Sequence, residues 1–164
     1  CKVKSKPGDG SSFMFFLPAE KKKTKRIIEK AEKNDIINGK GTILLIDDEK
    51  GVVEVCSEML ETLGYQVKSA YSGQQAIDIL NTEKVRIDLV ILEMVVLNMN
   101  GRETLEKIRS IIPDVKVLVS SGYSREEEIE KMLEIGCNEY ILKPFDVVTL
   151  SKKLDSVFKT VENV

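Results

Sequence analysis

The 164-residue chain contains no histidine and no tryptophan, and it has only four prolines. Without histidine it cannot form a Ser-His-Asp triad, a histidine-ligated metal site or an autophosphorylated histidine. Carboxylates, lysines and hydroxyl groups are therefore the side chains left for chemistry. No apolar run approaches the roughly 20 residues of a membrane-spanning helix, and no signal peptide is visible. We expect this segment to make no membrane contact and to be cytoplasmic, whether or not its parent protein is membrane-anchored elsewhere.

Charge and cysteine content exclude two further classes. Acidic and basic residues number 27 and 25 and are mixed along the chain, so no basic surface for nucleic acid is expected. Three cysteines, Cys1, Cys56 and Cys137, are odd in number and lack metal-ligand spacing. We therefore expect reduced thiols rather than a disulfide framework. With 42% hydrophobic residues, the chain can fill the core of one domain and carry an appendage.

From Thr42 onward, strand patterns and helix patterns alternate. Strands are predicted at 42–46, 66–70, 89–92, 116–119 and 139–142, and helices at 50–63, 73–81, 102–110, 125–135 and 147–161. Short connections between such elements require a parallel sheet with right-handed crossovers. The predicted fold class is α/β, with a doubly wound five-stranded parallel sheet spanning residues 41–164.

The chain before Gly41 has a different composition. Two short strand-like stretches surround the turn-rich Lys6-Pro-Gly-Asp-Gly10, which predicts a hairpin over residues 1–18. Residues 19–40 are dense in lysine and glutamate and have a thin apolar stripe at helical spacing. We expect a charged, partly helical linker that ends near the glycines at 39 and 41.

Acidic residues follow two of the predicted strands. Asp47 and Asp48 come directly after the first strand, and Glu93 follows the apolar run Leu89–Leu92. Because the carboxyl ends of parallel strands meet at one edge of a sheet, these three carboxylates are expected to converge. Like charges in proximity repel each other unless a cation neutralises them, and oxygen ligands suit Mg²⁺. The pattern therefore predicts a magnesium site.

Hydroxyl and ammonium groups are expected at the same edge. Ser120 and Ser121 end the fourth strand, and Lys143-Pro144 ends the fifth. Each of these features alone is common at strand ends. Together they would surround the carboxylates with hydrogen-bond donors.

Four motifs in order make the region Gly41–Val161 resemble a receiver domain of two-component response regulators. They are Leu45-Ile-Asp-Asp-Glu49, Asp88-Leu-Val-Ile-Leu92 with Asn98-Met-Asn-Gly101 downstream, Val119-Ser-Ser-Gly-Tyr123, and Tyr140-Ile-Leu-Lys-Pro-Phe145. The resemblance implies the flavodoxin-like receiver fold. It also implies that Asp47 and Asp48 hold Mg²⁺, with help from the residue at 93 and the backbone carbonyl of Val95.

The same resemblance implies roles for three more residues. Ser121 would take the hydroxyl position that contacts the phosphoryl group, and Lys143 the position of the lysine that pairs with it. Tyr140, like Ser121, would be a switch residue. The Lys143-Pro144 junction resembles the cis peptide of the family.

The resemblance departs from the family at the phosphoacceptor, because Glu93 stands where the family has aspartate. Leu97 also replaces a proline just beyond it. The extra methylene moves the nucleophilic oxygen by about 1 Å, which can cost about a hundredfold in rate. We expect inefficient phosphorylation at Glu93 and partial mimicry of the phosphorylated state, with one negative charge in place of roughly two. The glutamate is compatible with a degenerate receiver and equally with an engineered mimic.

The hairpin has a resemblance of its own. Ser5-Lys-Pro-Gly-Asp-Gly-Ser-Ser-Phe13, closing with Phe16-Leu-Pro18, resembles the last hairpin of the ATP-binding domain of sensor histidine kinases. The nucleotide-binding motifs of that domain are absent from the sequence, so we expect no nucleotide binding and no enzyme activity. The whole arrangement predicts the C-terminal receiver of a hybrid sensor histidine kinase. Its expected partners are a phosphohistidine-bearing kinase or phosphotransfer domain, and a second copy bound through the Arg125–Val161 face.

Two alternatives remain open at this stage. A degenerate receiver could act only as a protein-interaction domain, with a vestigial acidic cluster. A Mg²⁺-dependent phosphohydrolase would also gather carboxylates at strand ends. Such enzymes usually place a second aspartate two residues after the nucleophile, whereas Glu49 occupies that place after Asp47.

Overall fold

The structure is a computed structural model that describes residues 1–17, 36–83, 85–96, 99–122, 133–134 and 136–159. The chain forms two units, Cys1–Glu32 and Lys33–Val164, and each is described by itself. None of the helices in these described ranges has both the length and the apolar character needed to cross a lipid bilayer.

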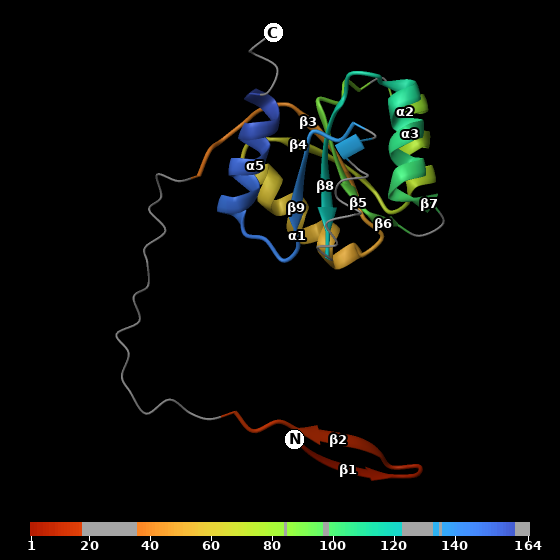
Figure 1. The fold of residues 1–164 in the computed structure, drawn as a ribbon, viewed down its shortest axis with the longest axis vertical. Coiled ribbons are helices and arrows are strands. Elements are labelled where there is room, and N and C mark those ends of the chain that lie inside the picture. Colours follow the sequence, from red (N-terminus) through yellow and green to blue (C-terminus); the bar gives the residue numbers. More distant parts are fainter. Residues whose placement is uncertain (18–35, 84, 97–98, 123–132, 135, 160–164) are drawn as a thin grey trace. The chain divides into compact units, whose positions relative to one another are not determined.

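The larger unit is built on a five-stranded sheet (Figure 1). All neighbouring strands in it are parallel, in the order β4-β3-β5-β8-β9. The strands are β3 (Thr42–Ile46), β4 (Gln66–Ala70), β5 (Leu89–Glu93), β8 (Lys116–Ser121) and β9 (Glu139–Leu142). This order, with every neighbouring pair parallel, confirms the predicted doubly wound α/β fold.

Helices cover both faces of this sheet. Helices α1 (Lys50–Thr62) and α5 (Val147–Lys159) lie on one face, and α2 (Gly73–Thr82) and α3 (Gly101–Ile111) on the other (Figure 1). The predicted helix 125–135 lies outside the described residues except for positions 133 and 134, which are helical.

Strand β3 shows how the sequence produces a core on both faces. Ile43 and Leu45 pack with α1 and α5, whereas Leu44 and Ile46 pack with α2 and α3. All four are at most 2% exposed, because alternate side chains of a central strand enter opposite layers. The uninterrupted apolar runs of the central strands follow from this double burial.

Local signals in the sequence begin and end the helices. The Ser72 hydroxyl accepts a hydrogen bond from the Gln75 amide and caps α2. At the end of α1, Gly64 adopts a left-handed φ of 95°, which a glycine reaches without steric cost. The Asp146 carboxylate accepts a hydrogen bond from the Thr149 amide at 2.8 Å, and this bond lowers the pKa of that carboxyl.

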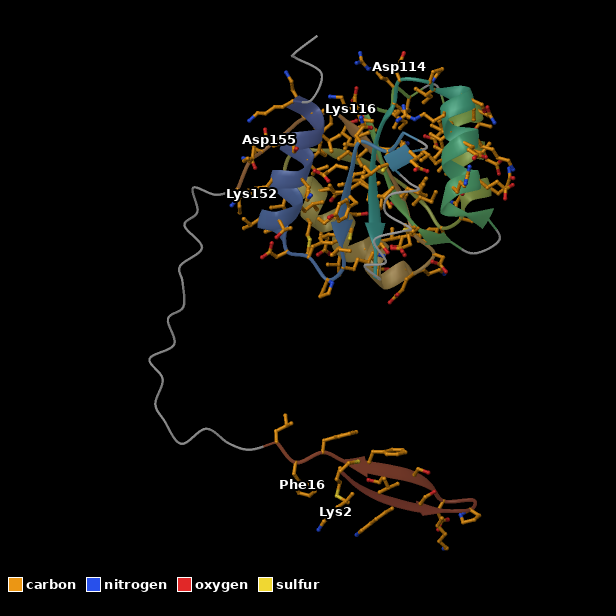
Figure 2. The ribbon with its side chains drawn as sticks, viewed as in Figure 1. Lys2, Phe16, Asp114, Lys116, Lys152 and Asp155 are labelled. Atoms are coloured by element: carbon orange, nitrogen blue, oxygen red, sulfur yellow. The ribbon has the colours of Figure 1, made fainter. Side chains whose placement is uncertain are left out.

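The smaller unit is an antiparallel hairpin of β1 (Lys2–Lys6) and β2 (Gly10–Met14). Val3 pairs with Phe13 across the two strands, and both side chains are more than half exposed. The Lys2 ammonium lies 5.7 Å from the centroid of the Phe16 ring. Both residues are labelled in Figure 2. Residues 19–35, which are most of the predicted linker 19–40, lie outside the described residues, as does residue 18.

Candidate functional site

The carboxyl edge of the sheet brings together residues that lie far apart in the sequence. Asp47 directly follows β3, Glu93 is the last residue of its neighbour β5, and Lys143 directly follows the edge strand β9. The Lys143 ammonium lies 2.5 Å from the Asp47 carboxylate and also contacts the Glu93 carboxylate. The structure therefore joins three of the predicted site residues in one ion cluster.

This cluster is largely shielded from water. The side chains of Asp47, Glu93 and Lys143 are 3%, 10% and 22% exposed. Burial by itself would lower the pKa of Lys143, but its hydrogen bonds to the two carboxylates and their negative charges outweigh burial, so that its pKa is raised. Lys143 is therefore a firmly protonated cation between two acids.

Asp47 and Asp48 have different surroundings although they are adjacent in the sequence. The second oxygen of the Asp47 carboxylate accepts a hydrogen bond from the Glu49 amide at 3.0 Å. Asp48 is half-buried, and among the described residues Lys143 pairs with Asp47 and Glu93 rather than with Asp48. Asp48 thus lies next to the cluster in the chain without sharing its cation.

The loop after β5 is fixed through its backbone. Strands β6 (Val95–Val96) and β7 (Met99–Asn100) form a small antiparallel pair. The Gly101 amide then donates to the Met94 carbonyl at 3.1 Å. A Cβ atom at Gly101 would lie 2.7 Å from that same oxygen, so only glycine fits here without displacing backbone. This closure sets the position of the Val95 main chain.

The oxygen groups at this edge suit Mg²⁺ by their chemistry. The two aspartates and the Val95 carbonyl are hard ligands, and Mg²⁺ is usually held by one or two carboxylates with water in the remaining positions. No group of three acidic or cysteine side chains in the described part of the chain is arranged to hold a metal by itself. A magnesium ion at this edge would therefore need water or backbone oxygens among its ligands.

The two serines at the end of β8 occupy different places. The Ser120 hydroxyl lies 3.4 Å from the Glu93 carboxylate, within hydrogen-bond reach, and the two residues are register partners on neighbouring strands. Ser121 is buried, and its carbonyl accepts a hydrogen bond from the Lys143 amide at 2.8 Å. Sequence reasoning expected both hydroxyls near the carboxylates but gave a specific role to Ser121 alone. The signal for Ser120 is the pairing register of β5 and β8.

The predicted switch residue and the peptide before Pro144 also belong to this region. Tyr140 is half-buried on β9 and packs against the core layer of α2 and α3. The Lys153 ammonium lies 5.0 Å from the centroid of its ring. The Lys143-Pro144 peptide bond is cis, as the resemblance implied.

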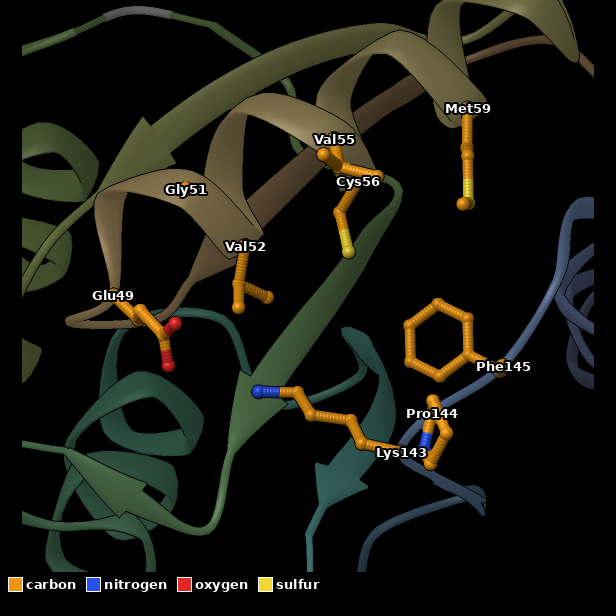
Figure 3. Close-up of a pocket in the computed structure, with 9 residues that line it drawn as sticks. All are labelled: Glu49, Gly51, Val52, Val55, Cys56, Met59, Lys143, Pro144 and Phe145. Carbon is orange, nitrogen blue, oxygen red and sulfur yellow. The ribbon is translucent and has the colours of Figure 1, made fainter. Parts of the chain in front are cut away.

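An apolar pocket of about 400 Å³ adjoins the ion cluster. Figure 3 shows Val52, Cys56 and Met59 of α1 facing Phe145 across the pocket, with Lys143 at its edge. Burial raises the pKa of the Cys56 thiol, so this cysteine contributes packing rather than reactivity. Sequence reasoning did not predict this pocket.

Residues 43–155, which contain this site, match one protein family. The model of the response regulator receiver domain matches residues 43–155. The chain belongs to this family. Receiver domains are parts of two-component signalling systems, and the ion cluster of Asp47, Glu93 and Lys143 lies within the matched residues.

Two curated relatives share sequence similarity with this chain. Sporulation initiation phosphotransferase F of Bacillus subtilis is 34% identical over 105 residues, which cover 64% of this chain and 83% of that protein. Sensor kinase CckA of Brucella abortus is 29% identical over 154 residues, which cover 90% of this chain but only 16% of the kinase. This chain therefore corresponds to a small part of the kinase.

Solved structures confirm the fold of the receiver domain. The chemotaxis protein CheY4 of Vibrio cholerae superposes with a TM-score of 0.67 at 26% identity, covering 73% of this chain and 99% of that one. The CheX-CheY-BeF3-Mg²⁺ complex of Borrelia burgdorferi contains a chain with a TM-score of 0.68 at 24% identity, covering 72% of this chain and 89% of that one. At that identity, the second likeness speaks for the fold alone.

Proposed function

We propose that this receiver domain serves a two-component phosphorelay with Glu93 at the phosphoacceptor position, as a partial mimic of the phosphorylated state. The observation that supports this most directly is the contact between the Lys143 ammonium and the Glu93 carboxylate. In the family, the corresponding lysine pairs with the phosphoryl group. Glu93 thus offers this lysine a negative charge without phosphorylation.

Two physical differences make the mimicry partial and the acceptor poor. A carboxylate carries one negative charge, whereas a phosphoryl group carries roughly two. A ligand or modification shifts a two-state equilibrium only as far as its differential interaction allows, so one charge shifts it only in part. In addition, Lys143 and Ser120 contact the Glu93 carboxylate, and its nucleophilic oxygen is displaced by about 1 Å relative to an aspartate.

Within this proposal, Asp47, Asp48, the residue at 93 and the Val95 carbonyl would together hold Mg²⁺. The ion would supply positive charge for the oxygens of a transferring phosphoryl group. Ser121 takes the phosphoryl-contacting hydroxyl position, and Tyr140 with Ser121 forms the switch.

The proposed parent protein is a hybrid sensor histidine kinase. The similarity to sensor kinase CckA covers 90% of the chain and so extends beyond residues 41–164 into the segment before them. The hairpin over 1–18 would then end the ATP-binding domain, 19–40 would be the linker, and 41–164 the cytoplasmic receiver. This fragment would have no enzyme activity of its own. Its partners would be a phosphohistidine-bearing kinase or phosphotransfer domain and, through the Arg125–Val161 face, a second copy.

The proposal is tested by weighing the intact chain after incubation with Mg²⁺ and a small phosphodonor such as acetyl phosphate. The unaltered chain should stay unmodified, whereas Glu93→Asp should gain one phosphoryl group. A Glu93→Gln variant is the matched control, because it has the length of glutamate but no nucleophilic carboxylate. Stoichiometric phosphorylation of the unaltered chain at Glu93 would refute the blocked acceptor.

A second candidate function is a protein-interaction domain that uses no metal. The ion cluster favours it, because the Lys143 ammonium contacts both buried carboxylates and offsets one of their two negative charges without a metal. Titration of Mg²⁺ into the unaltered chain and into Asp48→Ala separates the two functions. A magnesium-using receiver should bind the ion more tightly than Asp48→Ala does, and equal affinities would support the interaction domain.

A further inference from the structure

The last residues of the linker are built into the receiver domain. We define the strap as residues 37–41. The Ile37 amide donates to the Ser151 hydroxyl of α5 at 3.4 Å. The Gly39 amide donates to the Leu63 carbonyl at the end of α1, at 2.8 Å. Each bond ties the strap to a different helix on the same face of the sheet.

The strap depends on the absence of a side chain at Gly39. A Cβ atom at this position would lie 1.9 Å from the Tyr65 hydroxyl oxygen. The backbone of Gly39 is not in the left-handed region, so alanine would be excluded by lack of space rather than by its φ preference. Gly64 packs against the strap in the same way, because a Cβ atom at Gly64 would lie 2.6 Å from the Gly39 carbonyl oxygen.

Helix α5 connects the strap to the opposite, acidic end of the domain. Its first residue, Val147, comes four residues after Lys143 in the chain, and Phe145 between them packs on the same core as α5. Near its other end, the Phe158 ring stacks on Tyr65 with 5.9 Å between centroids. Ile37, Tyr65 and Phe158 line a single pocket of about 560 Å³.

We propose that the strap is a coupling element between α5 and the linker. When the strap is docked, it holds α5 through Ser151 and the Tyr65–Phe158 stack. A displacement of α5 releases the strap, and release of the strap loosens α5, since coupling between two sites is reciprocal. A change at Lys143, or a partner bound to α5, would in this way alter how the linker leaves the domain. The physical basis is that the strap has two states, docked and released, and that both α5 and the linker shift the equilibrium between them.

Amide hydrogen exchange of the full chain, followed by NMR, tests this proposal. In the unaltered chain, the Ile37 and Gly39 amides should exchange at least about tenfold more slowly than in an unstructured peptide. Gly39→Ala should remove this protection and speed exchange in the second half of α5, around Leu154. Amides of α3, on the other face of the sheet, should keep their rates. Gly51→Ala is the matched control, because nothing lies within 4 Å of a Cβ atom at Gly51.

Ser151→Ala tests the same coupling from the helix and decides the matter if Gly39→Ala fails to fold. It removes the acceptor of the Ile37 amide and should speed exchange at Ile37. Ser110→Ala is its control, since Ser110 and Ser151 both donate to the carbonyl three residues earlier, but Ser110 lies on α3. The proposal is overturned if strap amides of the unaltered chain exchange as in a free peptide. It is equally overturned if strap variants leave the exchange of α5 unchanged. Neither outcome bears on phosphorylation at Glu93.

Discussion

Replacement of Lys143 by methionine is the sharpest test of the ion cluster. Methionine keeps much of the length and apolar contact of the lysine stem but removes the ammonium group. Asp47 and Glu93 would then be two buried carboxylates without their cation. Removing one partner of a buried ion pair costs about 3–5 kcal/mol, because the remaining charge is left uncompensated. The Lys143 side chain is only 22% exposed, so solvent screening reduces this figure little.

Urea unfolding measures the effect. With a denaturant slope of about 2 kcal/mol per molar, a loss of 4 kcal/mol lowers the unfolding midpoint by about 2 M. Lys68→Met is the control, because the ion pair of Lys68 with Glu83 is 39% exposed on both sides and should contribute at most about 1 kcal/mol. Adding Glu93→Gln to Lys143→Met should recover part of the lost stability, because only one buried carboxylate then remains. If Lys143→Met costs no more than Lys68→Met, the cluster does not stabilise the fold and the reasoning fails.

Three further predictions concern pH, a glycine and the thiols. Because the pKa of Lys143 is raised, the stability that this lysine contributes is complete below about pH 10.4, the pKa of an unfolded lysine, and is lost as the pH rises through its folded pKa. Urea midpoints measured from pH 9 upward should therefore fall more steeply for the unaltered chain than for Lys143→Met. Equal slopes for the two chains would contradict this. Gly101→Ala should cost about 1–3 kcal/mol in the same assay, because its Cβ meets the Met94 carbonyl, whereas Gly51→Ala should cost nothing. At pH 8, iodoacetamide should alkylate the exposed Cys1 and spare the buried Cys137, because mainly burial raises the pKa of the Cys137 thiol to about 11. Rapid labelling of Cys137 in the native chain would contradict that burial.

The fold could be predicted because its signals are local and redundant. Alternating strand and helix patterns, separated by short connections, define a parallel α/β sheet without any tertiary information. The predicted positions of the strand ends were less accurate. β5 extends to Glu93 and β8 to Ser121, one and two residues beyond the predicted ends. Polar residues that end a strand look like loop residues in a sequence, although here they are buried members of the sheet.

The site could be predicted only as far as the rule that carboxyl ends of parallel strands share an edge. That rule brought Asp47, Glu93 and Lys143 together, as the structure shows. It could not distinguish Asp47 from Asp48, because their different burial depends on which way each side chain points. It placed Ser120 near the carboxylates but could not single it out as the contact of Glu93, because that contact is set by the register of β5 with β8. Local sequence patterns determine neither the order of the strands in the sheet nor the register in which they pair.

The strand order also sets how this domain must acquire its structure. The central strand β3 has β4 and β5 as its neighbours, so its pairing with β5 spans two complete helices of intervening chain. Because all pairs in the five-stranded sheet are parallel, none of them is a hairpin with a tight turn that could form first and guide the pairing of the other strands. The chain must close large loops before sheet contacts compensate the lost entropy. Refolding of this domain should therefore take on the order of milliseconds or longer, with the β3–β5 pairing as the slow event to be sought in its kinetics.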